Sequence, residues 1–344
     1  MTASAREAPA VQRPEPPSPR LGFLGVGWIG RHRMHAIARS GIATISAVAD
    51  VSHDVAREAS REIGEDLYIA GSLEELLDQQ LDGIVIATPS ALHADQAITA
   101  LEHGAAVFCQ KPLARTAPET QRVVDAARAA DLLLGVDLSY RYTAGMTAIR
   151  DLVRRGELGR IFAVDLVFHN AYGPDKRWFR DPALSGGGCA IDLGIHLVDL
   201  ALWTLDFPDV RAATSRLYAR GSTLSDRRTE VEDYAVARID LESGASVQLA
   251  CSWNLSAGRD AVIRASFYGT TGGVALHNVN GSFYDFAAEH YRGTSTERLS
   301  DPPDEWGGRA AVDWARRLAA RSGFDPSAQR LVDVAAAIDL IYER

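Results

Sequence analysis

A chain of 344 residues is longer than one hydrophobic core usually supports, so the length favours two domains. The formal net charge of −9, with no dense block of Lys or Arg, argues against a protein that binds nucleic acid. Hydrophobic residues form 47% of the sequence and charged residues 24%, a mixture typical of folded globular proteins and not of disordered ones. We therefore expect a protein whose partner is a small molecule.

The first 20 residues differ in composition from the rest of the chain. They hold five prolines and lack the apolar segment of a signal peptide, so we expect residues 1–20 to form a disordered tail of a cytoplasmic protein. The most apolar run, residues 193–207, is interrupted by His196, Asp199 and Asp206. These polar residues favour a buried helix and no membrane span.

The three cysteines, Cys109, Cys189 and Cys251, are scattered and form no C-x-x-C pair. This usage favours free thiols in a reducing compartment and gives no metal-binding pattern. Cys109 has no activating His or Asp in its own motif, so we expect a buried structural thiol there and no nucleophile.

From residue 21 onward, short apolar runs alternate with segments of helical periodicity, which is typical of a parallel sheet with helices on both faces. The expected strands are residues 21–24, 42–49, 83–87, 105–109 and 132–136. The expected helices are residues 29–40, 73–79, 92–103 and 118–130. We therefore expect an α/β N-terminal domain with a doubly wound, parallel Rossmann sheet over residues 21–137.

A glycine motif follows the first expected strand and opens the first expected helix, in the order G-x-G-x-x-G. Gly25 permits a tight turn, Gly27 lets a pyrophosphate approach the backbone, and Gly30 lets the helix pack closely on the strand. The loop residues expected to contact a dinucleotide are Gly25, Gly27, Trp28, Ile29 and Gly30.

The second expected strand ends at Asp50, twenty residues after the last glycine of the motif. A carboxylate at this position accepts hydrogen bonds from the adenosine ribose and repels a 2′-phosphate. No Arg or Lys follows directly, although His53 and Arg57 lie nearby. We therefore expect NAD as the cofactor, with NADP the less favoured alternative.

After residue 150 the pattern changes to period-two alternation, which predicts strands of a largely antiparallel sheet with one polar face. The expected strands are residues 161–169, 211–219, 231–241, 245–253 and 262–268. We expect an α+β domain for substrate binding and oligomerisation, with a large, mainly antiparallel open sheet, over residues 138–325. A helix in residues 326–344 is expected to pack back on the Rossmann domain. The broad sheet favours a homodimer or homotetramer.

Two further segments complete a pattern: VFCQKPLA at residues 107–114 and GGGCAIDLGIHLVDLALW at residues 186–203. With the glycine motif, they resemble the glucose-fructose oxidoreductase, inositol dehydrogenase and rhizopine-catabolism family, Gfo/Idh/MocA. The resemblance covers nearly the whole chain from residue 21. It implies an NAD(P)-dependent dehydrogenase or ketoreductase that acts on CH–OH groups of sugars, aminosugars or cyclitols.

The resemblance also implies roles for individual residues. The lysine of the family's E-K-P motif maps onto Lys111, and its D-x-x-x-H pattern maps onto Asp192 and His196. Gln110 stands in place of the family glutamate, which removes a negative charge beside Lys111, and Ser90 stands in place of a loop asparagine. The residues expected to form this wall of the cofactor site are Thr88, Pro89, His93, Gln110 and Lys111.

The chemistry of a carbinol oxidation supports these roles independently, because one group must accept the hydroxyl proton while a hydride leaves the carbon. An imidazole suits this task near neutral pH, so His196 is expected to be the general acid/base. Asp192 lies four residues earlier and would share a helix face with it, as its orienter and as a substrate ligand. Lys111 is expected to stabilise alkoxide character on the same oxygen.

Each of these residues also has a structural interpretation. A histidine in an apolar helix is often a packed core residue, and Lys111 alone could be a strand-end lysine before a proline. The expected substrate ligands are Lys111, Arg141, Tyr142, Trp178, Asp192 and His196. Trp178 could stack on a pyranose face, or it could anchor a loop among basic neighbours.

Two other functions stay open on the sequence. One is NAD-dependent, redox-assisted glycoside cleavage, which would release an aglycone without net NADH. The other is a regulator that binds NAD(P) as a signal, which the retained Lys111, Asp192 and His196 disfavour and the altered Gln110 and Ser90 keep open.

Overall fold

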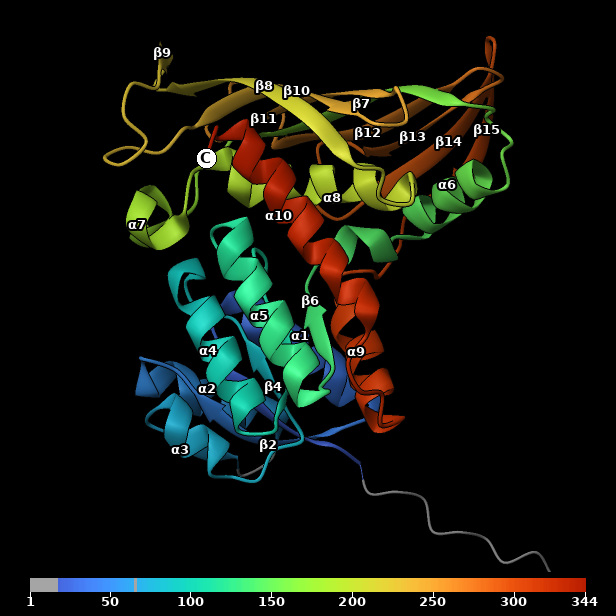
Figure 1. Ribbon diagram of the computed structural model, residues 1–344. Coiled ribbons are helices and arrows are strands. Elements are labelled where there is room, and N and C mark those ends of the chain that lie inside the picture. Colours follow the sequence, from blue (N-terminus) through green and yellow to red (C-terminus); the bar gives the residue numbers. More distant parts are fainter. Residues whose placement is uncertain (1–17, 65–66) are drawn as a thin grey trace, which may run out of the picture.

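The computed structural model describes residues 18–64 and 67–344. Two domains lie one above the other, and the chain returns to the lower one near its C-terminus (Figure 1). The expected tail, residues 1–20, lies outside the described residues except for its last three, and Arg20 already opens the first strand.

The N-terminal domain contains a six-stranded sheet in the order β3-β2-β1-β4-β5-β6, in which every neighbouring pair is parallel. Its strands are β1 (Arg20–Leu24), β2 (Thr44–Ala49), β3 (Tyr68–Ala70), β4 (Gly83–Ile86), β5 (Ala106–Cys109) and β6 (Leu134–Val136). The expected doubly wound Rossmann sheet is therefore confirmed. The sequence pattern did not reveal β3, because three residues are too few to show a period.

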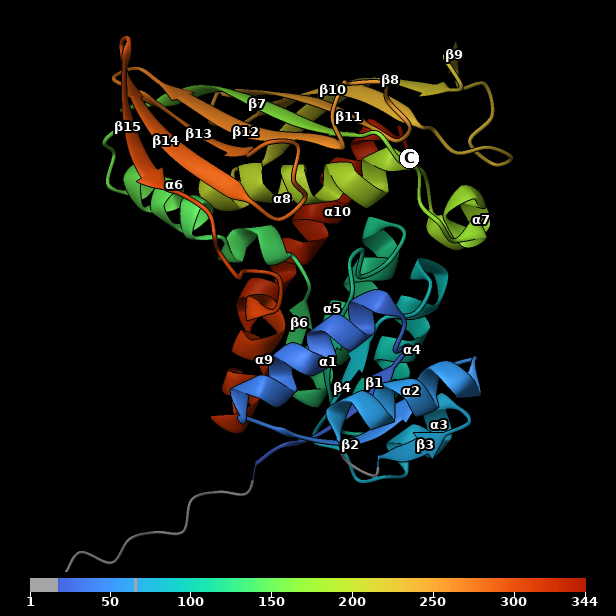
Figure 2. The same ribbon diagram turned by 180° about the vertical axis from the view of Figure 1, so that it is seen from behind.

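Helices cover both faces of this sheet (Figures 1 and 2). They are α1 (Trp28–Ser40), α2 (His53–Ile63), α3 (Leu73–Leu77), α4 (Ser90–Glu102) and α5 (Ala117–Ala130). Ser52, Ser72 and Thr116 each accept a backbone N–H three residues on, which fixes where α2, α3 and α5 begin. In contrast, α1 and α4 begin without a side-chain cap, at Gly27 and Pro89.

Helix α9 (Arg309–Ala319) departs from the expected domain boundary, which placed it with the C-terminal domain. It packs beside α1 on the Rossmann sheet, where its Trp314 is buried. A Cβ atom on Gly83 or Gly135 would come within 2.7 or 2.8 Å of the Trp314 ring. Residues far apart in sequence thus complete the core of the first domain, which no local pattern reveals.

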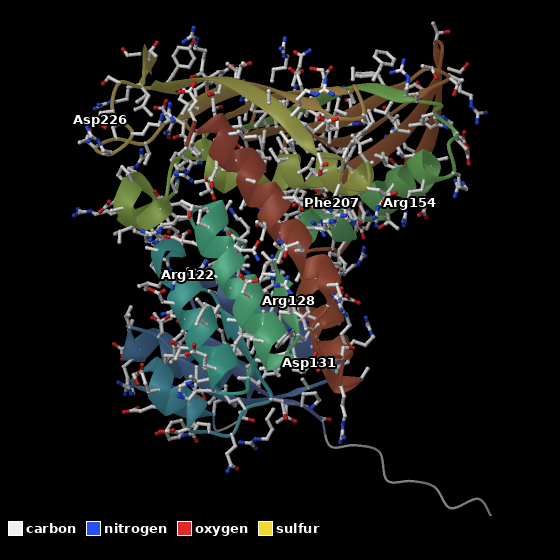
Figure 3. All side chains as sticks on the ribbon, viewed as in Figure 1. Arg122, Arg128, Asp131, Arg154, Phe207 and Asp226 are labelled. Carbon is white, nitrogen blue, oxygen red and sulfur yellow. The ribbon has the colours of Figure 1, made fainter. Side chains whose placement is uncertain are left out.

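The C-terminal helix α10 (Arg330–Ile341) lies at the junction of the two domains, against α5 on one side and α8 and β8 on the other (Figure 1). The Asp339 carboxylate accepts the Ala117 N–H at 2.7 Å. At the other end of α5, Asp131 accepts the Phe324 N–H at 3.1 Å, and the Arg128 guanidinium lies over the Phe324 ring. Arg128 and Asp131 are labelled in Figure 3.

The C-terminal domain contains a nine-stranded sheet in the order β15-β14-β13-β12-β7-β11-β10-β8-β9. Only the central β11–β7 pair is parallel, so the expected mainly antiparallel sheet is confirmed. Its strands are β7 (Ile161–Asn170), β8 (Val210–Ala219), β9 (Ser222–Thr223), β10 (Tyr234–Leu241), β11 (Ser246–Ser252), β12 (Ala261–Gly269), β13 (Gly273–Asn278), β14 (Phe286–Arg292) and β15 (Ser295–Ser300). The sequence pattern did not identify β13 to β15.

The helices of this domain cover the sheet face that looks toward the Rossmann domain, and the opposite face carries none (Figures 1 and 2). The longer ones are α6 (Ala144–Arg154) and α8 (Ile195–Thr204). The short helical segments of the chain are η1 (Ser139–Tyr142), η2 (Arg177–Arg180), α7 (Pro182–Ser185), the π-helical turn η3 (Ala190–Gly194) and η4 (Pro326–Gln329).

One helical stretch of the described residues, Pro182–Thr204, is long and apolar enough to cross a membrane by composition. In its most apolar window 78% of the residues are buried inside the protein, where α8 forms the centre of the C-terminal core. The stretch is therefore packed as a core helix.

Replacing Trp314 by Ala should open a cavity between α9 and the glycines of the sheet. We expect the free energy of unfolding to fall by about 3–5 kcal/mol, as for other aromatic-to-alanine changes in cores. Urea denaturation followed by circular dichroism measures it. Tyr68→Ala, at a half-exposed aromatic residue of β3, is the control and should lower the free energy of unfolding much less. An equal decrease in both variants would contradict the packing of α9.

Candidate active site

A cavity of about 550 Å³ lies between the two domains. Its floor is formed by the glycine loop after β1 and by the residues that follow β4, β5 and β6. Its opposite wall comes from the turn before α8 and from three loops of the C-terminal domain. The cavity thus lies at the carboxyl ends of the parallel strands, where open α/β sheets bind their ligands.

The glycine loop has the geometry that a dinucleotide requires. Gly25 has a φ of +85°, and a Cβ there would meet the Ala87 oxygen at 2.5 Å. A Cβ on Gly30 would lie 2.1 Å from the Gly25 oxygen, so only glycine lets α1 approach the strand. Gly27 has open space on its Cβ side and caps α1 without a side-chain hydrogen bond, which leaves the helix N-terminus available to a phosphate.

Trp28 and Ile29 also line the cavity. Asp50, one strand away, accepts the Val26 N–H at 3.0 Å and the Ser52 N–H at 2.9 Å. Its carboxylate therefore shapes the glycine loop and keeps lone pairs for further donors. Arg57, one of the nearby groups that could attract a 2′-phosphate, forms an ion pair with Asp54.

The loop after β4 is held by a buried histidine. The two ring nitrogens of His93 each lie 2.7 Å from a backbone oxygen, of Thr88 and of Pro112. Burial lowers the pKa of His93, against the effect of the two backbone oxygens that its ring nitrogens face. Thr88, Pro89 and His93 all line the cavity, with the polar atoms of His93 directed at the protein backbone.

Lys111 follows β5 and reaches across to the other domain. Its Nζ donates to the Asp192 carboxylate at 2.6 Å and to the Asp192 backbone oxygen at 2.7 Å. The second carboxylate oxygen of Asp192 accepts the Trp253 Nε1–H at 3.1 Å. Among the described residues, Asp192 makes no hydrogen bond with His196. The expected contact between these two side chains is therefore not present in this structure. The π-helical turn at Asp192 separates it from α8, and the two residues do not follow ordinary α-helical spacing.

The turn that carries Asp192 is fixed by a second, fully buried carboxylate. Glu232 accepts the N–H groups of Gly188 and Ala190 at 3.0 and 2.9 Å, and the Tyr342 hydroxyl at 2.7 Å. Burial raises the pKa of Glu232, against the effect of these donors. Tyr342 lies just beyond α10, so the end of the chain supports the site.

His196 lines the cavity from the first turn of α8 and is 7% exposed. Its Nδ1 is buried and has no hydrogen-bond partner among the described residues. Burial, and then the positive charges of Lys111 and Arg33, hold the pKa of His196 well below its usual value. The imidazole is therefore neutral at pH 7 and is able to accept a proton. The Tyr140 ring packs edge-on against it, with centroids 4.9 Å apart.

The floor also holds an ionic network of which the motifs identify only Gln110. Asp137, which follows β6, accepts hydrogen bonds at one carboxylate oxygen from Arg33 Nε at 2.6 Å and from Gln110 Nε2 at 2.5 Å. All three side chains are buried and line the cavity. The available signal was a charged residue directly after a buried strand, the same signal that singled out Asp50.

Arg141 and Tyr142 are not among the residues that line the cavity. The Arg141 guanidinium forms an ion pair with the buried Asp199 and lies 5.5 Å over the Phe207 ring, labelled in Figure 3. The Tyr142 hydroxyl donates to Asp313 at 3.3 Å. The structure places both residues away from the expected substrate contacts, because the turn of η1 directs other side chains into the cavity.

Trp178 does line the cavity and stacks on Phe179 with ring centroids 3.8 Å apart. The sequence pattern did not single out the other aromatic residues of this wall. They are Tyr140, Phe179, Phe283, Tyr284 and Trp306. They come from η1, from η2 and from the segments before β14 and after β15, so only the tertiary structure brings them together.

Family models match most of the chain. The model for the oxidoreductase family with an NAD-binding Rossmann fold matches residues 20–138, and the model for the GFO/IDH/MocA C-terminal domain matches residues 146–275. The chain belongs to the GFO/IDH/MocA oxidoreductase family. The expected membership is thus confirmed.

Individual relatives of this GFO/IDH/MocA protein agree with that result. Inositol 2-dehydrogenase 3 of Saccharopolyspora erythraea is 27% identical over 92% of this chain and 85% of its own length. The solved structure of GenD2 from gentamicin A biosynthesis, in complex with NAD, has a TM-score of 0.80 at 23% identity and covers 99% of this chain and 97% of its own. KijD10, a 3-ketoreductase from Actinomadura kijaniata with NADP, has a TM-score of 0.80 at 19% identity, over 95% of this chain and 98% of its own.

The lowered pKa of His196 predicts a pH dependence of stability. In the unfolded chain the His196 side chain takes up a proton near its ordinary pKa of 6.5. In the folded protein it does so only at lower pH. Stability is therefore fully present above pH 6.5 and is lost as the pH falls toward the folded-state pKa. Between pH 6.5 and the folded-state pKa, we expect the free energy of unfolding to fall with pH in both proteins. The fall should be steeper in native protein than in His196→Asn, by up to about 1.4 kcal/mol per pH unit.

Urea denaturation of both proteins at pH 8 to 5 measures this difference. His93 is present in both proteins, so its own contribution cancels. Parallel stability curves would show that the His196 side chain titrates normally.

Proposed function

We propose that this oxidoreductase transfers a hydride between NAD and a hydroxyl-bearing or keto carbon of a sugar, aminosugar or cyclitol. The observation that carries the proposal is the convergence of the Lys111–Asp192 pair and a neutral His196 in the cavity that the glycine loop opens. The open side of Gly27 and the uncapped start of α1 fit a dinucleotide pyrophosphate. When bound, the nicotinamide supplies the hydride acceptor or donor.

In the oxidising direction, the protein's own residues handle the proton. The neutral imidazole of His196 accepts the hydroxyl proton as the carbon loses its hydride. The Lys111 ammonium donates a hydrogen bond to the same oxygen and stabilises the negative charge that develops there. Asp192 holds that ammonium in place through its carboxylate and backbone oxygen. In the reducing direction the imidazolium returns the proton.

The aromatic wall supports a ring-shaped, polyhydroxylated substrate. Sugar rings have an apolar face of C–H groups that stacks on aromatic side chains, and the stacked Trp178–Phe179 pair offers such a surface. Hydroxyl groups at the ring edge would then face Lys111 and His196. The relatives' names, an inositol dehydrogenase and a ketoreductase, agree with this substrate class.

Other features support the remaining parts of the proposal. The helix-free outer face of the nine-stranded sheet offers a surface for a homodimer or homotetramer (Figure 1). The three cysteines are buried free thiols, which suits the reducing cytoplasm.

The assignment of Lys111 and His196 predicts separate effects on turnover and on binding. Lys111→Ala and His196→Ala should each lower kcat by about 10²–10⁴-fold, while NADH binding is largely kept. Absorbance of reduced nicotinamide with a panel of cyclitols, pyranoses, aminosugars and nucleotide sugars measures turnover. Arg154→Ala, at an exposed position of α6 labelled in Figure 3, is the control. Full turnover in both site variants would refute the assignment.

Asp50 supports NAD over NADP, because its carboxylate would repel a 2′-phosphate. We expect native protein to bind NADH roughly tenfold or more tightly than NADPH, a ratio that one unfavourable charge contact of about 1.4 kcal/mol produces. Asp50→Asn keeps the shape of the side chain and should narrow the ratio. Fluorescence titration of both dinucleotides gives the Kd values, and equal affinity in native protein would argue against the preference.

A further inference from the structure

One buried carboxylate oxygen of the cavity floor lacks a partner. Asp137 is 1% exposed, and its Oδ2 accepts both the Arg33 and the Gln110 hydrogen bonds. Its Oδ1 is buried and has no hydrogen-bond partner within residues 18–64 and 67–344. Buried acceptors are nearly always satisfied in folded proteins, because an unmade hydrogen bond costs the full desolvation of the group. Since Asp137 lines the cavity, a bound molecule is able to supply the missing donor.

The position of Asp137 indicates which molecule this is. It follows β6, on the Rossmann side of the cavity, and lies directly beside Gln110 at the end of β5. A dinucleotide whose pyrophosphate lies on the glycine loop extends from Asp50 at β2 toward the ends of β4 and β5. The substrate wall, with Trp178, is formed by the other domain.

The charge pattern also indicates a dinucleotide as the bound molecule. The residue before Lys111 is the neutral Gln110, so the negative charge on this part of the floor comes from Asp137 on the next strand. Arg33 balances that charge from α1, the helix that the glycine loop opens. One carboxylate therefore joins the glycine-loop helix to the ends of β5 and β6.

We propose that Asp137 Oδ1 accepts a hydrogen bond from a ribose hydroxyl of the nicotinamide half of the bound dinucleotide. Asp137 would thus contact the ribose of the nicotinamide half, as Asp50 is expected to contact the ribose of the adenosine half on the other side of the sheet. Arg33 and Gln110 are positioning residues, because both donate to Oδ2 and leave Oδ1 without a donor from the described residues. The inference rests on the dinucleotide binding of the proposed function and does not depend on the identity of the sugar.

A cycle that combines a protein variant with ligand analogues tests the contact directly. The probes are NADH and its analogues that lack the 2′- or the 3′-hydroxyl of the nicotinamide ribose. Native protein should bind one analogue about 10–100-fold more weakly than NADH, as expected for a hydrogen bond to a charged group. In Asp137→Asn the preference should fall to within about threefold, because the carboxylate partner is gone. Fluorescence titration without substrate gives each Kd.

Removing one partner of a buried ion pair destabilises the protein, because the other charge stays buried without a partner. A second variant is therefore included. Arg33→Met/Asp137→Asn removes both charges and should also lose the preference while keeping a cooperative thermal transition. A purely structural role of Asp137 would weaken NADH and its analogues by the same factor, and that result would overturn the inference.

Equal affinity of native protein for NADH and both analogues would also overturn it, as would an effect of Asp137→Asn on the KM for substrate alone. Failure of native protein to bind NADH at all would refute the proposed function instead, so the two outcomes are distinct.

Discussion

The ion pair between Lys111 and Asp192 is the contact on which the site depends, because its two members come from different domains. Lys111 is fixed by the strand before it, and Asp192 by a turn that the buried Glu232 holds. The pair therefore links the Rossmann floor directly to the opposite wall of the cavity. Its cost is desolvation of both charges, which the extra bonds from Trp253 and to the Asp192 backbone oxygen offset.

Burial acts differently on the neighbouring titratable groups. His196 has no ionic partner, and the adjacent cations add to its desolvation, so the imidazole stays neutral. Asp137 retains a cation beside it, and that cation is shared with no other carboxylate among the described residues. The cavity thus combines a proton acceptor, a fixed ammonium and a paired carboxylate within one apolar, aromatic enclosure.

Local patterns were sufficient to predict the Rossmann strands other than β3 and the position of the glycine loop, because each depends on residues close in sequence. The roles of Asp50, Lys111 and His196 stay predictions, and those of Lys111 and His196 come from the resemblance to the family. Contacts between distant segments were not predictable. The aromatic wall collects residues from segments that lie far apart in the sequence, and Trp314 packs on a sheet more than 150 residues earlier in the chain. Arg141 is one of the expected substrate ligands, but its side chain forms an ion pair with Asp199. Sequence order gives the place of a loop and leaves the direction of each side chain undetermined.

The return of α9 to the first domain has a consequence for biosynthesis. During translation, the sheet surface around Gly83 and Gly135 leaves the ribosome long before the helix that covers it. The nascent Rossmann domain must therefore carry an apolar groove until residues 309–319 have been made. A fragment that ends near residue 137 would keep this groove open permanently and would be prone to self-association.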